Sequence, residues 1–573
     1  MRAKDGASIA ITGSGIVCAL GTDKESVQKS LLENRTGIGE LRYLKSQHKE
    51  LPVGEVKMSD AELRHALAVA AEEEVSRTAL LGAYALRQAL EDARLSPQSL
   101  KGRRVTLISG TTVGGTEATE QYSCGNNTQA IARMVGIDCE LSTISTACSS
   151  ALNAIILGTR MLLCGETDIV LAGGTEALSL FHLNGFNSLM ILDHDVCRPF
   201  DATRQGLNLG EGAAYLVLQR TPDAHLQGSN IQAYITGWGN RCDAFHQTAT
   251  SENGEGAFMA MTEALQMAHL RPEEIDYVNA HGTGTPDNDT SESTALRRVF
   301  TENMPPVSST KSLTGHTTSA SGSIEAVICL IAMQSRFIPA NYGWSTGTPD
   351  CITPVSKTTQ KELHHVLCNS FGFGGNDSSL VISDKESPFD DVPQKDYILT
   401  GENEITQEEE LKELREYISP MESRRMCKVM KAAFLTSLRA IQKDGISKPD
   451  AIIVATQYGM LENGGKILNT IHEQGEEGIS PTLFMQSTHN TLAGALAIHL
   501  GCHGYNITYS QGKESLQWAL RDAQRLIREG KASSVLVGLH NHVPPTFKVV
   551  LDQQGITEQY EIYSKSIIIK SAL

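Results

Sequence analysis

Short apolar runs alternate with amphipathic segments along most of the chain, and this rhythm constrains the fold more than any other feature. It extends from residue 8 to about residue 385. Such alternation is typical of α/β proteins, in which helices cover a largely parallel or mixed sheet. The strand candidates are residues 8–16, 104–109, 169–172, 213–218, 277–280 and 379–382, and the helix candidates are residues 73–94, 149–163, 256–268, 291–300 and 323–335.

The rhythm stops once and then resumes. Residues 386–397 hold two prolines and several acids, and residues 402–416 are strongly acidic, which is typical of a solvated helix face. A chain of 573 residues is also too long for one ordinary hydrophobic core. The sequence therefore predicts an α/β domain over residues 1–385, an acidic linker over 386–419 and a second α/β domain over 420–573.

The two predicted domains share a short echo. Residues 165–173 spell Gly-Glu-Thr-Asp-Ile-Val-Leu-Ala-Gly, and residues 530–538 spell Gly-Lys-Ala-Ser-Ser-Val-Leu-Val-Gly. Each segment follows a helix-like stretch, and the two begin 365 positions apart (165 and 530). The echo suggests that the C-terminal domain copies the first half of the N-terminal domain.

Charge and hydropathy argue against several classes of protein. The net charge of -17 argues against nucleic acid as the main partner, because binding it requires a basic surface. No apolar run reaches about 18 residues, so no membrane span is expected. Residues 8–20 look faintly like a signal peptide, but Gly13 and Gly15 interrupt them. A first strand with a glycine turn is the better interpretation.

The cysteines and histidines give no metal signature. The 12 cysteines are scattered without a CxxC pair or a zinc spacing, which is typical of a chain in a reducing cytoplasm. Four C-terminal histidines have irregular spacing, and we interpret them as core or surface residues rather than ligands: His489, His503, His540 and His542. We expect no metal and no cofactor.

Cys148 is the candidate nucleophile. It lies between an apolar strand-like run and a nearly all-apolar helix-like segment, which is the pattern of a buried helix. At the N-terminus of that helix, the positive end of the helix dipole favours the thiolate that acyl transfer requires. The alternative is a small buried cysteine without a chemical role, and this local pattern alone favours neither.

Three later motifs add polar side chains at predicted strand ends. Residues 279–289 hold His281, Thr283, Thr285 and Asp289 among small residues. Residues 309–316 place Lys311 five positions before His316, and Glu325 follows on a helix-like segment. Residues 369–376 form a glycine-rich loop that contains Phe371, Phe373, Gly374 and Gly375. Singly, each motif also fits a core histidine, a surface lysine or a flexible loop.

Together and in this order, the motifs resemble the β-ketoacyl-acyl carrier protein synthases of the thiolase superfamily. Further matches are Arg198-Pro-Phe-Asp201, Arg204-Gln-Gly206, Gly210-Glu-Gly-Ala213 and Gly110-Thr-Thr-Val-Gly-Gly115. The resemblance covers residues 8–385. It implies a thiolase-like fold with αβαβα layers, no cofactor and an acyl carrier protein as partner.

The resemblance also implies roles for these residues. Cys148 would accept the acyl chain, and His281 and His316 would stabilise the enolate that forms when a malonyl thioester loses carbon dioxide. Lys311 and Glu325 would support this pair, and the backbone N–H groups of Cys148 and Phe373 would form the oxyanion hole. The remaining implied positions are Phe373 as a gate, Thr283, Thr285, Phe371, Gly374 and Gly375 as binding positions for the substrate and its phosphopantetheine arm, and Asp289 as a support.

The second domain resembles a half-length synthase-like protein, the chain-length-factor type found in bacterial aryl polyene pathways. The position 365 residues after Cys148 is Lys513, and the nearest preceding cysteine is Cys502. We therefore expect this domain to be catalytically silent and to pair with the synthase domain of its own or another chain, as a pseudo-dimer or within a homodimer. It would then shape the far end of the acyl pocket. Residues 115–148 and Leu207 depart from the family pattern, which leaves the acyl length open.

Three functions remain for such a chain. The first is decarboxylative condensation of an acyl group on Cys148 with malonyl-acyl carrier protein, in fatty acid or polyene and polyketide-type synthesis. The second is a carrier-binding partner without activity, and the intact Cys148, His281 and His316 argue against it. The third is a decarboxylase or acyltransferase without condensation, which the sequence does not separate from the first.

Overall fold

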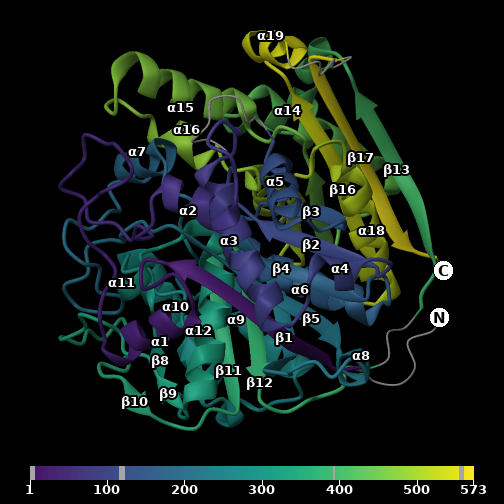
Figure 1. Cartoon of the computed structure of the whole chain (residues 1–573). Helices are drawn as coiled ribbons and strands as arrows, with labels where there is room; N and C mark the ends of the chain where they lie inside the picture. The colour runs from purple at the N-terminus through teal and green to yellow at the C-terminus, as the bar shows by residue number, and fades with distance from the viewer. Residues whose placement is uncertain (1–6, 115–122, 391–393, 554–559, 573) are drawn as a thin grey trace.

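The computed structural model describes residues 7–114, 123–390, 394–553 and 560–572 (Figure 1). One mixed sheet of 15 strands runs through both predicted domains, in the order β13-β17-β16-β14-β15-β3-β2-β4-β5-β1-β6-β12-β11-β7-β8. In the described residues no helix is long and apolar enough to cross a membrane.

The N-terminal unit has five layers. The helices α6 (Ser150–Leu163) and α12 (Ser321–Ser335) form the middle layer and pack against strands on both sides. The outer layers are α3 (Arg77–Asp92), on β1 and β5, and α9 (Glu255–Met267), on β6 and β12. The predicted layered α/β architecture is therefore confirmed. The strands of this unit are β1 (Ile9–Cys18), β2 (Val105–Gly110), β3 (Glu140–Ile144), β4 (Ile169–Glu176), β5 (Gly212–Arg220), β6 (Ala233–Cys242), β7 (Tyr277–Asn279), β8 (Val307–Ser308), β11 (His365–Gly372) and β12 (Asn376–Ser383).

Smaller elements complete this unit. They are α1 (Lys24–Leu32), α2 (Asp60–Leu67), α4 (Pro97–Leu100), α5 (Gly125–Val135), α7 (Leu180–Ser188), α8 (Thr221–Leu226), α10 (Pro286–Phe300), α11 (Lys311–Thr314), the 3-10 helices η1 (Pro272–Glu274) and η2 (Thr318–Ala320), and the two-stranded sheet of β9 (Phe337–Ile338) and β10 (Thr359–Gln360).

The glycines of the first strand explain how closely α3 packs. A Cβ atom on Gly13 would lie 2.4 Å from the carbonyl oxygen of Ala89, and one on Gly15 would lie 2.1 Å from that of Ala85. The helix therefore rests directly on the strand backbone, which requires residues without side chains. The interpretation of residues 8–16 as a buried strand is confirmed.

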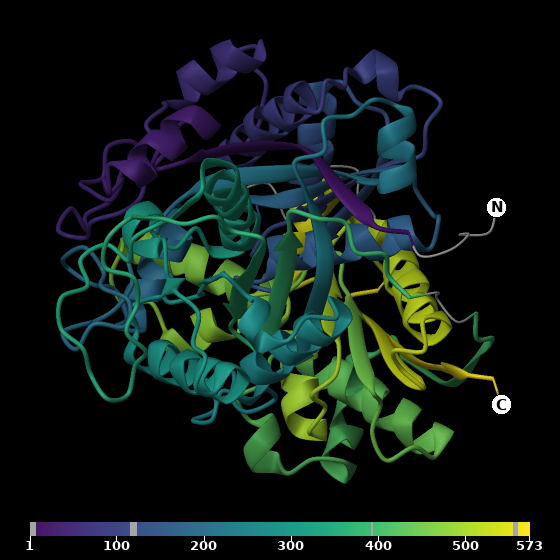
Figure 2. The ribbon, with the colours of Figure 1, turned by 90° about the horizontal axis from the view of Figure 1, so that it is seen from below.

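The C-terminal unit repeats the first half of the N-terminal unit. Its strands lie in the mirrored order of β1-β5-β4-β2-β3, and β15 meets β3 at the pair Tyr509–Ile144, which lies 365 positions apart. The helices α6 and α18 begin at Ser150 and Ser515, at the same spacing. The echo found in the sequence therefore marks a structural repeat, and the two copies lie side by side in one chain (Figures 1 and 2).

The elements of this unit begin before the predicted boundary. They are β13 (Tyr397–Ile405), η3 (Glu408–Glu416), α13 (Pro420–Ser423), α14 (Lys428–Asp444), β14 (Ala451–Ala455), α15 (Leu461–Gln474), α16 (Pro481–Met485), α17 (Thr491–Leu500), β15 (Asn506–Tyr509), η4 (Gly512–Glu514), α18 (Ser515–Arg528), β16 (Ser534–His542), α19 (Pro545–Gln553) and β17 (Ile562–Ser571).

The prediction of a linker over residues 386–419 was wrong for most of that range. Strand β13 pairs with β17 in antiparallel register, and Ile405 is buried. The acidic helix η3 packs on α14 through the buried Leu414. Sequence composition hid these elements because only a few of their apolar side chains are buried, and Ile398 and Leu399 of β13 are themselves exposed.

Candidate active site

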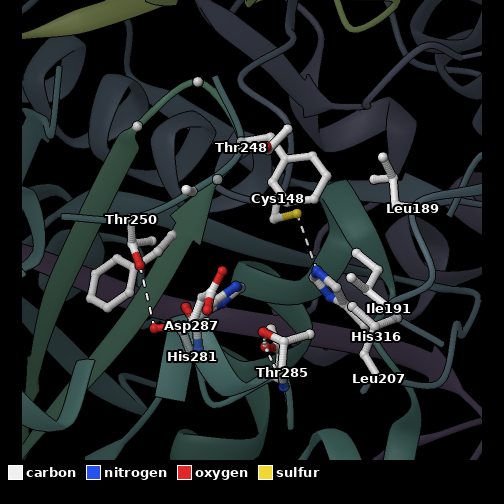
Figure 3. Close-up of a pocket in the computed structure, with 18 of the residues that line it drawn as sticks. Cys148, Leu189, Ile191, Leu207, Thr248, Thr250, His281, Thr285, Asp287 and His316 are labelled. Carbon is white, nitrogen blue, oxygen red and sulfur yellow. Dashed lines mark hydrogen bonds between the residues drawn. The ribbon is translucent and has the colours of Figure 1, made fainter. Parts of the chain in front are cut away.

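Cys148 lies in a sharp turn between β3 and α6. The preceding residue, Ala147, has a φ of 52°, in the left-handed region that side chains rarely adopt. The backbone N–H of Thr146 donates to the hydroxyl of Ser150 at 2.8 Å, which closes the turn. The turn places the Cys148 thiol, 6% exposed, at the wall of a cavity (Figure 3).

Two histidines face the thiol from the other half of the unit. The Nε2 atom of His316 lies 3.1 Å from Sγ of Cys148, and its Nδ1 atom lies 3.0 Å from the hydroxyl of Ser321. The ring of His281 stands edge-on to that of His316, with 5.4 Å between ring centroids. Both rings line the same cavity as the thiol (Figure 3).

Burial keeps both imidazoles neutral. It lowers the pKa of His281 and of His316 well below the ordinary value, and the positive charge of Lys311 lowers each pKa further. A neutral imidazole can donate one N–H and accept at its other nitrogen. Two such groups in one cavity can therefore stabilise a negative oxygen or take up a proton.

Lys311 and Glu325 form a buried ion pair next to the histidines. The Lys311 ammonium lies 2.5 Å from a Glu325 carboxylate oxygen, and both side chains are almost fully buried. Burial raises the pKa of Glu325 to about 7, and the attraction of Lys311 opposes this rise. Neither residue lines the cavity, so the pair acts on the histidines through its charge rather than by contact with substrate.

The expected thiolate is not the resting form of Cys148. Burial raises the pKa of the thiol to about 12, although Lys311 and the backbone N–H groups of Phe373 and Cys148 lower it. In this site the cost of removing the charged form from water exceeds the effect of the helix dipole. The thiol must therefore lose its proton when it reacts, and Nε2 of His316 is within reach to accept it.

The glycine-rich loop between β11 and β12 lies over the thiol. Gly374 and Gly375 have φ values of 85° and 77°, which allow the tight turn. The ring of Phe373 stacks on Phe186 at 5.8 Å, and its carbonyl oxygen accepts a hydrogen bond of 2.7 Å from the Asn490 side chain of the C-terminal unit. Contacts from both units therefore hold Phe373, the predicted gate.

The cavity has a volume of about 270 Å³, and two threonines are among the residues that line it. The hydroxyls of Thr283 and Thr285 lie 2.8 Å apart on its wall. Asp289 lies beneath this turn rather than in the cavity, and its carboxyl group accepts from the backbone N–H groups of Thr283 and Phe200. The predicted residues in the cavity are Cys148, His281, His316, Thr283, Thr285, Phe371, Phe373, Gly374 and Gly375.

Sequence reasoning missed several residues of the site. The buried Glu292 accepts hydrogen bonds from the backbone N–H groups of His281 at 2.8 Å and Gly282 at 2.7 Å. Its spacing of three residues from Asp289 on α10 is the signal that could have found it. Four other cavity residues carry no signal in the sequence, because they come from loops far from the motifs: Leu189, Ile191, Thr248 and Thr250. Asp287 lies in the first turn of α10, within the 279–289 motif, and Asp377 lies on β12.

A second, smaller cavity lies on another side of the thiol. Besides Cys148, it is lined by Thr112 and Thr318, and by Phe484 and Thr488 of the C-terminal unit. The ring of Phe484 packs on the backbone of Gly185, where a Cβ atom would lie 2.1 Å from it. The C-terminal unit therefore forms part of the wall behind the nucleophile.

The four C-terminal histidines lie with different partners. His489 contacts the thiol of Cys124 at 3.3 Å, His503 the carbonyl oxygen of Cys242 at 3.1 Å, His540 the hydroxyl of Ser564 at 2.7 Å, and His542 the carboxylate of Glu462 at 3.4 Å. In the described ranges, no group of three or more His, Cys, Asp or Glu side chains is placed to hold a metal ion.

Comparisons with known proteins match this geometry. The family model "Beta-ketoacyl synthase, N-terminal domain" matches residues 7–224, the corresponding C-terminal domain matches 232–344, and a second N-terminal-domain model matches 400–566. The chain is 33% identical to nodulation protein E of Rhizobium meliloti (strain 1021) over 400 residues, which are 65% of this chain and 98% of that protein.

Two further proteins extend the match. The chain is 30% identical to 3-oxoacyl-[acyl-carrier-protein] synthase 2 of Vibrio cholerae serotype O1 over 414 residues, 65% of this chain and 98% of that one. The solved structure described as "PfaC Keto synthase-Chain length factor" superimposes with a TM-score of 0.79 at 18% identity, and the match covers 99% of this chain and 78% of that one. The last match shows that the fold extends over both units.

Proposed function

The chain belongs to the β-ketoacyl synthase family, and from this premise we propose how its own residues carry out the family's reaction. That reaction is an acyl transfer in which an acyl thioester and malonyl-acyl carrier protein condense, with loss of carbon dioxide, to 3-oxoacyl-acyl carrier protein. The observation that carries the assignment is that Cys148, His281 and His316 all line one cavity.

In the first step, Cys148 takes the acyl group. Its Sγ atom bonds to the acyl carbon while its proton moves to Nε2 of His316, 3.1 Å away. The proton then goes to the departing phosphopantetheine sulfur, so the first carrier leaves as a thiol. The backbone N–H groups of Cys148 and Phe373, which both point toward Sγ, are placed to bind the oxyanion of this step.

In the second step, the malonyl thioester loses carbon dioxide and becomes an enolate. For this step His316 changes tautomer, so that Nε2 carries the proton and Nδ1 accepts from the Ser321 hydroxyl. The N–H groups of His281 and His316 then donate to the enolate oxygen, and burial together with Lys311 keeps both rings neutral. The enolate carbon attacks the acyl carbon, and Sγ of Cys148 leaves and takes up a proton from solvent. Thr283 and Thr285, on the wall of the same cavity, would hold the phosphopantetheine arm.

The C-terminal unit is proposed to be a silent partner in cis. It carries the exposed Lys513 at the repeat position of Cys148, and its sheet joins the synthase unit through β15 and β3. It would act as the second half of a pseudo-dimer. Phe484 would then limit the acyl chain, because its ring closes the small cavity behind the nucleophile.

The product and location follow from the same assignment. We place the products among fatty acyl or polyketide-type chains, whose length the C-terminal unit would set. None of the 12 cysteines, all within the described residues, forms a disulfide, which supports a reducing compartment such as the cytoplasm.

Mass spectrometry of the carrier-bound product tests the function. The full chain is given acyl-carrier and malonyl-carrier protein together, and a 3-oxoacyl product two carbons longer is expected. Acetyl-carrier protein without elongation would instead indicate a decarboxylase. The absence of any reaction would favour a carrier-binding partner without activity.

A further inference from the structure

Two threonine hydroxyls lie buried next to Cys148, and that of Thr318 has no hydrogen-bond partner among the residues that the structure describes. Both residues line the small cavity beside Cys148, and their exposed fractions are 6% for Thr112 and 3% for Thr318. Neither side-chain oxygen makes a hydrogen bond of ordinary geometry. The Thr112 hydroxyl still interacts with the Glu176 carboxyl group, whereas the Thr318 hydroxyl has no such neighbour in the described part of the chain. Buried hydroxyls are normally paired, so their position requires an explanation.

The backbone at Thr318 is also strained. Its φ of 46° is in the left-handed region, which a β-branched side chain adopts only at a cost. Thr318 begins η2, two residues after His316 in the chain. Strain of this kind persists where the surrounding structure holds a residue in place, and here it holds a hydroxyl at the cavity wall.

The rest of the cavity wall is mostly apolar. The aromatic rings of Phe181, Phe186, Phe373 and Phe484 surround it, together with Ala147. The free volume of this cavity is about 10 Å³, close to the space that one water molecule needs. An acyl chain that enters beside Cys148 must therefore displace any water molecule that pairs with these hydroxyls. A plain alkyl chain would leave the Thr318 hydroxyl unpaired.

We propose that the acyl group carried on Cys148 bears an oxygen, as a hydroxyl or keto group on one of its first carbons, and that Thr318 and Thr112 bind this oxygen. The proposal rests on the proposed function, because it places the acyl chain on Cys148. It makes Thr318 a specificity-determining residue and oxygenated acyl thioesters the preferred donors. A site built to bind an oxygen discriminates strongly against an analogue that lacks it.

Acylation of Cys148 by matched donors tests the proposal. The full-length protein is incubated with hexanoyl- or 3-hydroxyhexanoyl-pantetheine, and the rate of the mass increase is followed on the intact protein. We expect the hydroxylated donor to react about tenfold faster or more, since it alone pairs with the hydroxyls. In Thr318→Val, which keeps the shape, we expect the ratio of the two rates to fall to about one.

Two further variants separate the possible causes. Thr112→Val should lower the ratio less than Thr318→Val, since Thr112 lies near Glu176. Thr508→Val removes another buried hydroxyl without a hydrogen bond, in β15 and outside this cavity, and should leave the ratio unchanged. Equal rates for both donors in the wild type would overturn the oxygenated-donor proposal and leave Cys148 as the acyl site. Loading by neither thioester would overturn the assignment of Cys148 itself.

Discussion

The same strand-turn-helix unit occurs twice in this chain, and its turn carries a cysteine only in the first copy. In the first copy the turn after β3 presents the buried Cys148 to a cavity, and in the second copy the turn after β15 presents the exposed Lys513. The scaffold is therefore not sufficient for a site. What the first copy has beside it is a second half of the same unit: the segment from β6 to β12 brings the two histidines and Lys311 to Cys148.

The middle helices of the two copies, α6 and α18, differ in how many of their residues are buried. All 14 residues of α6 are buried, because α12 covers the side that faces away from β2 and β4. Only 8 of the 14 residues of α18 are buried, and its two exposed positions, Gln517 and Arg528, are polar. A helix between two sheets must be apolar all round, whereas a helix with one covered side becomes amphipathic.

The first prediction sharpens the comparison of the two turns and has the largest effect. Cys148→Ala should abolish acyl loading while decarboxylation of malonyl-carrier protein remains possible, because the histidines stay in place. Lys513→Ala is the matched control at the repeat position and should leave loading within about twofold. Mass spectrometry of the intact protein measures both variants. Loading that persists in Cys148→Ala would refute the nucleophile assignment.

The second prediction concerns the half that brings the histidines to the first copy. His281→Ala should slow decarboxylation by about 10²- to 10³-fold, the usual effect of removing one donor to a developing oxyanion. Acyl loading should change much less, because Cys148 contacts His316 rather than His281. Carbon dioxide release and acyl loading are measured separately. An equal loss in both steps would show that His281 supports the structure of the site instead of the enolate.

The third prediction makes the two middle helices more alike. Asp522 on α18 pairs with both Arg160 and Arg525 at the boundary of the units, and its repeat position on α6, 365 residues earlier, is Leu157. Asp522→Leu should lower the free energy of unfolding by about 3–5 kcal/mol, because it removes a buried partner of two arginines. Urea unfolding measures this. Gln517→Leu, on the uncovered side of α18, is the control and should have little effect.

Most of the site could be predicted from sequence, and the shape around it could not. The motifs at His281, Lys311 and Phe373 each span a few residues, and their order along the chain was enough to place them together. The walls formed by Thr318, Thr248 and Phe484 depend on how distant loops and the second unit pack, which no local pattern encodes. The predicted linker failed for the same reason, since β13 acquires its structure only by pairing with β17.

The fourth prediction compares the buried histidines of the two units through pH. The lowered pKa values of His281 and His316 mean that both remain neutral as the pH falls through 6.5, so the acid limb of decarboxylation should lie well below pH 6.5. A limb near 6.5 would contradict the burial of the pair. His540 of the second unit, whose pKa burial lowers to about 3, should have no part in this limb.

His540 should instead contribute to the pH dependence of stability. A folded-state pKa below the unfolded value means that its contribution is complete above about pH 6.5 and is lost as the pH falls toward 3. The slope is about 1.4 kcal/mol per pH unit for one histidine. His540→Asn should reduce this slope in urea unfolding between pH 6 and 4 and leave the acid limb of decarboxylation unchanged. A shifted limb would mean that the second unit takes part in the chemistry.

The last prediction tests whether the C-terminal unit affects acyl loading in the N-terminal unit. Asn490 donates a hydrogen bond of 2.7 Å to the carbonyl oxygen of Phe373, and it is a link from the second unit to the gate loop. Asn490→Ala removes a hydrogen bond that contributes about 0.5–1.5 kcal/mol, so loading and condensation should change by only a few fold. The direction is informative: if the bond holds the gate closed, its loss should speed acyl loading. Slower loading in Asn490→Ala, with normal loading in the neighbouring Thr488→Val, would mean that the bond positions the Phe373 N–H group for the oxyanion. Unchanged loading would confine the second unit to the walls of the acyl cavity, because the gate would then open without it.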